Sequence, residues 1–522
     1  MMKKGKIIWK SGSKILLFLI FFLLIILWRS ADWFLNNFDG VELSTAIYQL
    51  FSPLKGTASE IIDDYLSQCL YPSVFFAIIA VLVYTLYDMM AGRIFLEANV
   101  RIGAKRLSIG GKKSRYTSKR KVLILWLCIA VLCGCVWNKA VEVGVPGYLE
   151  SVTNVSSIFE SEYISPDDVA ITFPEKKRNL IFIYMESMET TYASTQDGGG
   201  KPVNYIPELT QLAEENLFFS DDEDLGGAGF AKGAGWTMAA LLSSSTGVPY
   251  KLPIGGDDAG EYERFAPGLK GLGEVLLENG YQNYFMCGSD VTFAGRKDFY
   301  EQHGDYHILD YNSAKEDGII PEDYEVFWGM EDEKLYEYAK QQLTEIASQS
   351  EPFNFTMLTV DMHPPDGYMC GLCDDAYENQ YENVLACASR QAAQFVDWIS
   401  RQEWYENTTI VITGDHRNMK SDFWDDIGDY NRKIYNCFIN LPDGLSAVQT
   451  TNREFSVLDL FPTTLAAIGV DIEGDRLALG TNLFSDKKTL PEEMGFKEFN
   501  AELSLYSNYY YKNFIIGNKD WT

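Results

Sequence analysis

Three long apolar runs dominate the first quarter of the chain. Ile15–Trp28, Leu70–Tyr87 and Val122–Trp137 contain no charged residue, and the last two approach the length that crosses a bilayer. These runs predict three transmembrane helices. The first run has only 14 residues, so a secretory signal or a buried core helix competes with this interpretation. We favour a span, because Trp33–Leu35 can extend the run and no small-residue cleavage site follows it.

Basic residues flank these runs and predict their orientation. Five lysines precede the first run, and the loop between the second and third runs carries ten Lys and Arg between Arg93 and Lys121. We expect both segments in the cytoplasm, because positive charge is retained on that side of a membrane. Everything after Trp137 then lies outside, in a multi-pass protein of the bacterial cell membrane. A basic loop can also bind nucleic acid, but between two apolar runs a topology signal is the better interpretation, and we expect no nucleic-acid partner.

Charge separates the chain into two parts. Residues 1–138 carry 17 Lys and Arg against 8 Asp and Glu, whereas all 522 residues together have a formal net charge of −29, so the remainder carries −38. With 47% hydrophobic residues the chain can bury a large core, and disorder is not expected. We expect a membrane anchor at 1–138, a juxtamembrane linker without steady periodicity at 139–178, and a folded extracytoplasmic domain at 179–522.

Short apolar runs alternate with amphipathic stretches in this last part. The runs have the length of buried strands, and the stretches have apolar residues at three- and four-residue spacing. The predicted strands are Asn179–Met185, Tyr281–Cys287, Phe353–Val360, Thr408–Thr413 and Ile434–Asn440. The predicted helices are Pro207–Leu217, Leu269–Asn279, Asp332–Ser348 and Asn383–Arg401. The alternation predicts an α/β fold in which helices flank a sheet.

Polar residues follow two of these strands directly. Glu186 comes just after the first strand, and Asp415 and His416 come just after the fourth. Sheets of this kind bind ligands at the carboxyl ends of their strands, so the fold can bring the three side chains together. Two carboxylates and an imidazole are ligands for a divalent cation. Taken singly, each carboxylate is more often a helix cap or turn former, and the histidine more often a structural one.

A candidate nucleophile stands in "KGAGWTMAALLSSSTG" (Lys232–Gly247). Two glycines permit a tight turn, and Thr237 then opens an apolar run that predicts a helix. At a helix N-terminus the amide groups and the dipole stabilise both an alkoxide and a transferring phosphoryl group. Thr237 taken by itself is also explained as an N-cap.

Five motifs in order carry a resemblance to a known family. They are "NLIFIYMESME", "GAGWTMA", "GYQNYFMCGSDVTFAGRKDF", "TVDMHPPDGY" and "GDH". Over about Asn179 to Ser485 the chain resembles bacterial phosphoglycerol transferases of the periplasmic glucan type and, more distantly, lipoteichoic acid synthase. These enzymes belong to the alkaline phosphatase and sulfatase superfamily, so the resemblance implies an alkaline phosphatase-like sheet.

The resemblance implies a role for each matching residue. The implied metal ligands are Glu186, Thr237, Asp415 and His416. The implied substrate-binding residues are Arg296, His363, Ser289 and Asp290. Thr237 would also be the nucleophile, and His363 would lie near the phosphoryl group or the leaving oxygen. Ala294 stands where some relatives have Trp, which leaves the headgroup contacts open.

The implied reaction agrees with elementary chemistry. A threonine hydroxyl is a poor nucleophile at neutral pH, and ligation to a dication lowers its pKa. The ligand set favours Mn²⁺, with Mg²⁺ and Zn²⁺ as alternatives. We expect phosphoglycerol to pass from phosphatidylglycerol, through a phosphothreonine, to an extracytoplasmic glycan, glycolipid or lipid acceptor, with release of diacylglycerol.

Three other functions compete with this one. Sulfatase activity is disfavoured, because no cysteine is followed by Pro at plus two and Arg at plus four, as the sulfatase signature requires. A phosphoethanolamine transferase or a phosphodiesterase of the same superfamily stays open. A non-catalytic receptor for lipid or glycan stays open too, although the complete set of implied ligands argues against it.

Three of the nine cysteines lie close together in the sequence. Cys370 and Cys373 form "CGLC", and Cys387 follows soon after. The pattern is compatible with zinc or redox chemistry, but outside the cytoplasm a disulfide is the more natural expectation. We predict a Cys373–Cys387 disulfide with Cys370 left over.

Overall fold

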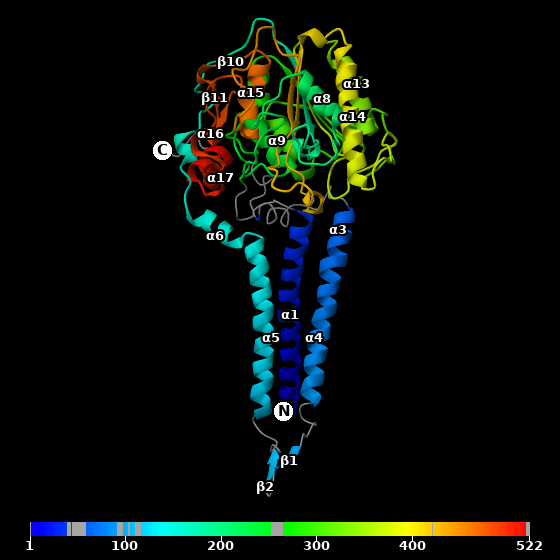
Figure 1. Ribbon diagram of the computed structural model, residues 1–522, viewed down its shortest axis with the longest axis vertical. Helices are drawn as coiled ribbons and strands as arrows, with labels where there is room; N and C mark the ends of the chain where they lie inside the picture. Colours follow the sequence, from blue (N-terminus) through cyan, green and yellow to red (C-terminus); the bar gives the residue numbers. More distant parts are fainter. Residues whose placement is uncertain are drawn as a thin grey trace. The chain divides into compact units, whose positions relative to one another are not determined.

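The computed structural model describes residues 2–38, 43, 59–90, 98–102, 105–109, 116–251, 265–419 and 421–517 (Figure 1). The chain divides into two units, which are described separately. The first consists of Met1–Asn36 and Ser59–Pro146, and the second of Asn37–Ala58 and Gly147–Thr522.

Long apolar helices make up most of the first unit. Its elements are α1 (Met2–Asn37), α3 (Ser59–Tyr65), the π-helix η1 (Leu66–Leu70), α4 (Tyr71–Met90), the hairpin β1 (Ala98–Ile102) and β2 (Lys105–Ile109), and α5 (Tyr116–Glu142). Three stretches are long and apolar enough to cross a membrane, namely Lys14–Asn37, Ile62–Tyr87 and Val122–Glu142. The three predicted apolar helices are thus confirmed, and the first extends through Trp33–Leu35 as expected.

These helices contact one another through few side chains. Leu17 and Phe21 of α1 pack with Ala77 of α4, whereas Leu23, Leu82 and Trp126 are about half exposed or more. Large apolar side chains that remain exposed along a whole helix are stable in hydrocarbon but costly in water. The first unit therefore has the surface of a membrane anchor.

A six-stranded sheet forms the centre of the second unit. Its strand order is β6-β5-β7-β4-β8-β9, and all neighbours are parallel except β8 and β9. The strands are β4 (Asn179–Met185), β5 (Gln282–Cys287), β6 (His307–Leu309), β7 (Phe353–Leu358), β8 (Thr408–Gly414) and β9 (Asn436–Ile439). All five predicted strands are present. Within this sheet, β6, a three-residue strand at the edge, was not predicted from the sequence.

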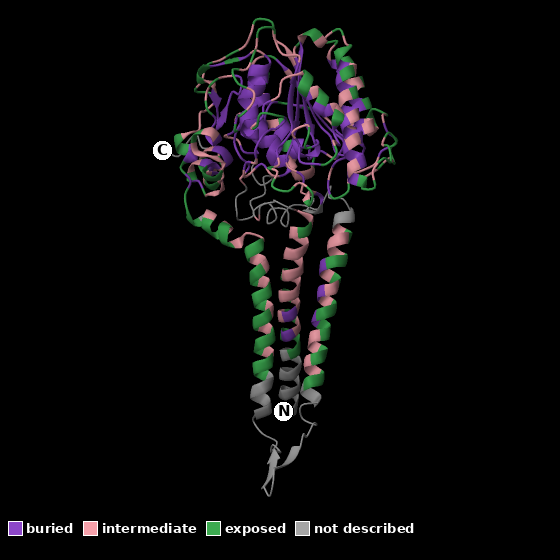
Figure 2. Cartoon of the chain, in the orientation of Figure 1, coloured by how far each residue is buried: buried purple, intermediate pink, exposed green. Residues whose placement is uncertain are grey.

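Helices cover both faces of this sheet, and the residues at the centre of the unit are buried (Figure 2). Helices α9 (Thr237–Thr246), α10 (Leu272–Glu278) and α15 (Leu460–Ala467) pack on the face of Leu180 and Phe182 of β4. Helices α8 (Pro207–Glu215), α13 (Asp332–Ile346) and α14 (Gln380–Ser400) pack on the face of Ile181 and Ile183. Because both faces are buried, the strands are almost continuously apolar. The predicted α/β class is confirmed.

Shorter elements complete the second unit. They are α6 (Val145–Thr153), α7 (Ile158–Ser161), β3 (Ile171–Thr172), α11 (Arg296–Gln302), α12 (Tyr311–Glu316), β10 (Asp471–Ile472), β11 (Arg476–Leu477), β12 (Gly480–Thr481), α16 (Leu490–Met494), α17 (Phe496–Ser504), α18 (Asn508–Tyr510) and η8 (Tyr511–Ile515). The 3₁₀ turns are η2 (Thr190–Tyr192), η3 (Phe293–Gly295), η4 (Tyr405–Asn407), η5 (Ser421–Trp424), η6 (Val457–Asp459) and η7 (Glu473–Asp475). Strand β3 lies in the expected linker and pairs with β10. The expected domain boundaries stay a prediction.

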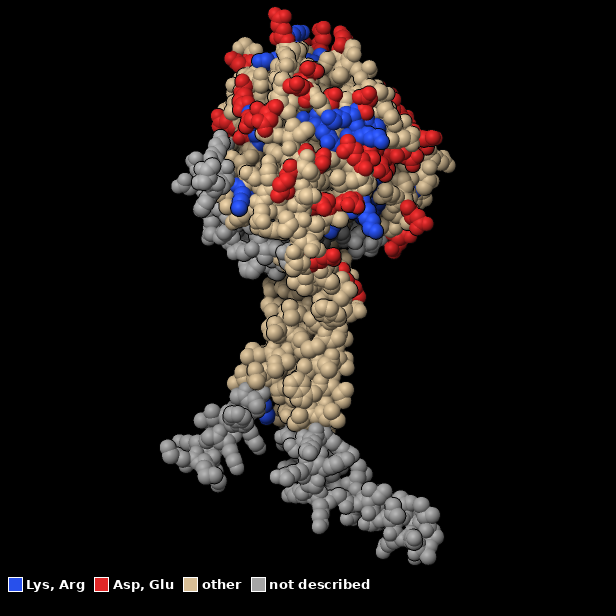
Figure 3. All heavy atoms as spheres, turned by 90° about the vertical axis from the view of Figure 1, so that its left-hand side faces the viewer, with Lys and Arg blue, Asp and Glu red and all other residues tan. Residues whose placement is uncertain are grey.

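Acidic side chains are spread over the face of the second unit that Figure 3 displays, with smaller groups of Lys and Arg between them. This distribution agrees with the excess of Asp and Glu after residue 138. An anionic ligand would be repelled at long range by such a surface, so its binding needs local positive charge.

Candidate active site

Two neighbouring parallel strands carry the first candidate residues. Met185 of β4 pairs with Gly414 of β8, so the residues that follow them, Glu186 and Asp415, emerge side by side at the carboxyl edge of the sheet. The chains approach so closely there that a Cβ on Gly414 would lie 1.9 Å from the carbonyl oxygen of Met188. Only glycine fits at that point, which explains the "GDH" pattern.

Four of the predicted residues lie in direct contact. The Nε2 atom of His416 is 3.5 Å from Oε1 of Glu186 and 3.4 Å from Oδ2 of Asp415. The Oγ1 atom of Thr237 is 3.3 Å from Oε2 of Glu186 and 3.4 Å from Nε2 of His416. Glu186, Asp415 and His416 are at most 2% exposed, whereas Thr237 is only half-buried. The hydroxyl is therefore the part of the group that a ligand can reach.

Hydrogen bonds orient the ligand atoms toward one another. Oδ1 of Asp415 accepts from the backbone amides of Ser187 (2.8 Å) and His416 (2.7 Å), while Oδ2 is buried without a hydrogen-bond partner. Nδ1 of His416 lies 2.8 Å from the carbonyl oxygen of Arg417. Because a carbonyl only accepts, Nδ1 carries a proton, and Nε2 faces the two carboxylates. A positive charge at this point, either a proton or a cation, would be stabilised by these groups.

The electrostatics of the group point the same way. Burial, followed by the charge of Glu186, raises the pKa of Asp415 to about 7. Burial opposes protonation of His416, but the carboxylates of Asp415 and Glu186 outweigh it and raise its pKa. Two carboxylates in a low-dielectric site repel each other and stabilise any positive charge between them. The protein side chains here supply at most one such charge, on His416.

The local backbone brings Thr237 to this point. Helix α9 begins at Thr237, after Trp236 in an extended conformation at the N-cap position. Gly233 has φ of +82°, and a Cβ there would lie 2.8 Å from Cβ of Pro249, so the turn before the helix requires glycine. Thr237 is thus the first helical residue and not the cap, and its hydroxyl lies at the positive end of the helix dipole.

His363 lies beyond the end of β7, the other neighbour of β4. Its Nδ1 is 2.9 Å from the carbonyl oxygen of Pro364, so Nδ1 is protonated and Nε2 is free to accept. Burial lowers the pKa of His363, and the charge of Glu186 opposes this less strongly. The imidazole is therefore neutral near pH 7. The Trp328 ring packs against it with centroids 4.6 Å apart.

The remaining predicted residues form a second group on one loop. Nη2 of Arg296 donates to Oγ of Ser289 and to the carbonyl oxygen of Asp290, each at 2.9 Å. The carboxylate of Asp290 instead accepts from the amide (2.8 Å) and hydroxyl (2.6 Å) of Thr292, as a turn-forming residue does. Arg296 interacts electrostatically with His363, which links this loop to the first group.

A buried ion pair behind the site was not predicted from the sequence. Glu189 is fully buried, and its carboxylate accepts from Nε (3.0 Å) and Nη2 (2.5 Å) of Arg432. It also accepts from the backbone amide of Asn418 (2.8 Å), two residues after His416. The pair thereby fixes the loop that carries Asp415 and His416. The second acid in "MESME" was its only signal in the sequence.

The cysteines after His363 also lie together. Cys370, Cys373 and Cys387 are free thiols, and Sγ of Cys370 is 3.7 Å from that of Cys373 and 3.9 Å from that of Cys387. The predicted Cys373–Cys387 disulfide stays a prediction.

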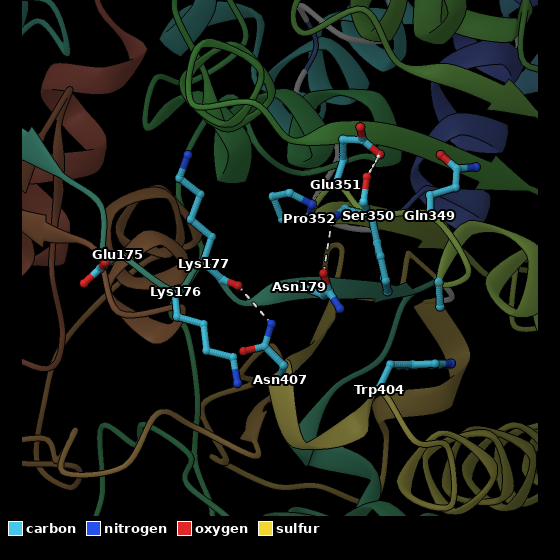
Figure 4. Close-up of a pocket in the computed structure, with 12 residues that line it drawn as sticks. Glu175, Lys176, Lys177, Asn179, Gln349, Ser350, Glu351, Pro352, Trp404 and Asn407 are labelled. Atoms are coloured by element: carbon cyan, nitrogen blue, oxygen red, sulfur yellow. Dashed lines mark hydrogen bonds between the residues drawn. The ribbon is translucent and has the colours of Figure 1, made fainter.

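A pocket of about 490 Å³ lies at the opposite, amino edge of the sheet (Figure 4). Its lining residues include Asn179 and Phe353, the first residues of β4 and β7. The Asn179 side chain accepts from the amide of Phe353 at 3.2 Å, and the Asn407 side chain donates to the carbonyl of Lys177 at 2.9 Å. Because these polar groups bond to one another and lie far along the strands from Glu186, we assign the pocket no role.

The chain is similar in sequence to curated proteins and in fold to solved structures. Phosphoglycerol transferase I of Escherichia coli (strain 55989 / EAEC) is 30% identical over 334 residues, which are 63% of this chain and 42% of that protein. The chain thus spans less than half the length of the curated relatives it matches. Lipoteichoic acid synthase LtaP of Listeria monocytogenes is 18% identical, with a TM-score of 0.45 over 63% of this chain and 80% of that one.

A membrane protein shares the fold over nearly the whole chain. Lipooligosaccharide phosphoethanolamine transferase A (EptA) of Neisseria meningitidis is 13% identical, with a TM-score of 0.50 over 95% of this chain and 87% of that one. Residues 178–470, more than half of the chain, match the sulfatase family. The resemblance stated from the motifs is confirmed, and the chain belongs to the sulfatase family.

Proposed function

We propose that this protein is a metal-dependent transferase that moves phosphoglycerol from phosphatidylglycerol to an extracytoplasmic glycan or lipid acceptor. The observation that carries the proposal is the contact between the Thr237 hydroxyl and the buried group of Glu186, Asp415 and His416. The hydroxyl of a half-buried threonine at a helix N-terminus, beside ligands for a cation, is the arrangement that a covalent phosphotransferase needs.

The residues present fit one divalent cation. Oδ2 of Asp415, a buried carboxylate oxygen without a hydrogen bond, is an open ligand position. Glu186, Asp415, His416 and Thr237 together offer mostly oxygen with one nitrogen, a set that suits Mn²⁺ and also accepts Mg²⁺ or Zn²⁺. A bound cation would lower the pKa of the Thr237 hydroxyl and offset negative charge on the substrate phosphate.

In the proposed first step, Oγ1 of Thr237 attacks the phosphorus of phosphatidylglycerol. The new bond joins threonine to phosphorus, and the bond from phosphorus to the diacylglycerol oxygen breaks. Nε2 of His363, on a neutral imidazole, would take the hydroxyl proton of the threonine and pass it to the leaving diacylglycerol oxygen. The products are diacylglycerol and a phosphothreonine that carries glycerol.

In the second step, an acceptor hydroxyl attacks the same phosphorus and Thr237 leaves. His363 acts as the base toward the acceptor, because burial keeps its imidazole neutral. Arg296 and Ser289, joined by a 2.9 Å hydrogen bond, would contact the phosphate and the glycerol headgroup. The Asp290 carboxylate, occupied within its own turn, is the weakest of the proposed substrate contacts.

Membrane attachment complements this chemistry. We propose that α1, α4 and α5 all cross the membrane, with the basic segments in the cytoplasm and residues 179–522 outside as the catalytic domain. Residues 139–178 would connect the two. An acidic domain attracts phosphatidylglycerol poorly from solution, but an anchor holds enzyme and lipid at one surface.

The test is to incubate the full chain in detergent with labelled phosphatidylglycerol and Mn²⁺. We expect diacylglycerol to be released and mass spectrometry to find glycerophosphate on Thr237. Turnover of phosphatidylethanolamine instead would identify a phosphoethanolamine transferase. Release of free glycerol phosphate without an acceptor would favour a phosphodiesterase. Binding of the lipid without turnover of either would identify a receptor and overturn the proposal.

A further inference from the structure

The three clustered cysteines form a compact group of soft ligands. The sulfur atoms of Cys370, Cys373 and Cys387 all lie within 4.8 Å of one another. Cys370 and Cys373 lie at the two ends of one turn, where the amide of Cys373 donates to the carbonyl of Cys370 at 3.2 Å. Cys387 comes from α14. Cys370 and Cys387 are buried and Cys373 is half-buried, so a small ion can enter from one side.

The measured distances match those of thiolates around one cation. Zn²⁺ binds thiolate sulfur at about 2.3 Å, so two ligands at a tetrahedral angle are about 3.8 Å apart. The observed distances from Cys370 to its two neighbours are 3.7 and 3.9 Å. A disulfide requires about 2.05 Å, and it can join only two of three sulfurs. A cation can bind all three at once.

Polar neighbours support negative charge on these sulfurs. Nε2 of Gln391 lies 3.4 Å from Sγ of Cys387 and 3.7 Å from Sγ of Cys370. Nη2 of Arg390 lies 4.0 Å from Sγ of Cys387, and its Nη1 pairs with Asp374 at 3.0 Å. Donors that lie beside a sulfur atom stabilise its thiolate, the form that binds metal.

We propose that Cys370, Cys373 and Cys387 form a second metal site, which binds a soft thiophilic cation of the Zn²⁺ type through three thiolates. The group consists of thiols alone, whereas the active-site group has oxygen and nitrogen ligands. Soft sulfur ligands select Zn²⁺ or Cu⁺ and disfavour Mn²⁺ and Mg²⁺. The thiol group thus disfavours Mn²⁺, which suits the active-site ligands, and this inference does not depend on the proposed function.

Such a site would fix the loop between His363 and α14. The loop starts with a bond from the amide of Gly367 to the carbonyl of His363 (3.2 Å), and the amide of Tyr368 donates to Asp361 (2.7 Å). A cation held by Cys370, Cys373 and Cys387 would tie the far end of the loop to α14. Three protein ligands leave the fourth position of a tetrahedral cation to water, and the bound cation would hold this loop in place.

The test measures metal bound to the full chain, purified in detergent without chelator or reductant. We expect one equivalent of Zn²⁺ or another soft cation per chain that survives Asp415→Asn. Replacement by Cd²⁺ should produce a thiolate-to-metal charge-transfer absorption, which oxygen and nitrogen ligands do not give. Both the bound cation and the absorption should be lost in Cys370→Ala and retained in Cys437→Ala, a matched buried cysteine outside the group.

A further variant guards against misfolding. Cys373 is only half-buried, so Cys373→Ala is expected to fold and still to lose the absorption. The proposal is overturned if the wild-type chain gives no such absorption, or if the absorption persists in Cys373→Ala. It is also overturned if intact-mass and peptide analysis of the purified chain find a disulfide between two of the three cysteines.

Discussion

Replacing Thr237 with alanine removes the proposed nucleophile and one of the four proposed metal ligands. In a covalent mechanism the loss of the nucleophile leaves only substrate binding and electrostatic stabilisation, so we expect kcat for diacylglycerol release to fall by at least about 10⁴-fold. The affinity for phosphatidylglycerol should change much less. Arg296 and the buried ligands of the site are untouched by the substitution.

The structure also predicts that the variant folds. The contacts of Oγ1 with Glu186 and His416, at 3.3 and 3.4 Å, are long for hydrogen bonds, and together contribute about 1 kcal/mol. Alanine returns up to about 0.7 kcal/mol through its higher helix propensity. Trp236 holds the N-cap position, so no capping bond is lost. The free energy of unfolding should therefore change by less than about 1 kcal/mol.

The assay follows labelled diacylglycerol from phosphatidylglycerol vesicles, with thermal unfolding measured in parallel. Thr237→Ser is the matched control, because it keeps the hydroxyl and removes one methyl group. We expect the serine variant to retain turnover and to carry the glycerophosphate adduct at residue 237. Substantial turnover by Thr237→Ala, or an adduct on another residue of that variant, would refute the reasoning.

Three further outcomes follow from the structure. Burial lowers the pKa of His363 below 6.5, so its base form is lost only on acidification. In a pH–rate profile, kcat should therefore fall as the pH drops below this pKa, and His363→Gln should be slow and lack this fall. Glu189→Gln should lower the free energy of unfolding by about 3 kcal/mol in chemical denaturation, because it breaks an ion pair whose carboxylate is fully buried and whose guanidinium is largely buried. The exposed pair Arg401–Asp397 has the same 2.5 Å separation, and Asp397→Asn should cost under about 1 kcal/mol; equal costs would contradict the argument from burial. Chelation by EDTA should abolish turnover and lower the melting temperature. Mn²⁺ at 100 times its Kd should then raise the free energy of unfolding by about 2.7 kcal/mol. If chelation leaves the stability unchanged, no cation is bound.

The sequence predicted the strands well because they are buried on both faces. A strand such as Thr408–Gly414 is apolar at nearly every position, and that run is visible without a structure. Strand β6 was missed because it has three residues at the sheet edge and only one neighbour. Helix α15 was missed as well, because an eight-residue helix buried all round has no polar face to mark its period.

The candidate site was predictable where one local rule applied. Residues that follow neighbouring parallel strands must emerge together, and this rule brought Glu186 and Asp415 into one group. The pair of Glu189 and Arg432 had no such rule, because 243 residues separate its members and neither has a local pattern. The pairing of the cysteines could not be predicted from the sequence either, because the geometry of the loop determines which sulfur atoms lie close to one another.

Under the proposed function an acidic domain must bind an anionic lipid, and the charges of the site account for how it would do so. Glu186 and Asp415 contribute two negative charges at the buried centre, and His416 is neutral when its Nε2 lone pair faces a cation. One dication would balance these charges, so the centre would neither repel a phosphodiester nor hold the product too tightly. Arg296, 5% exposed, would then supply the local attraction that the surface lacks. Without the dication, protons on Asp415 and His416 would balance part of the same charge, because both groups have raised pKa values.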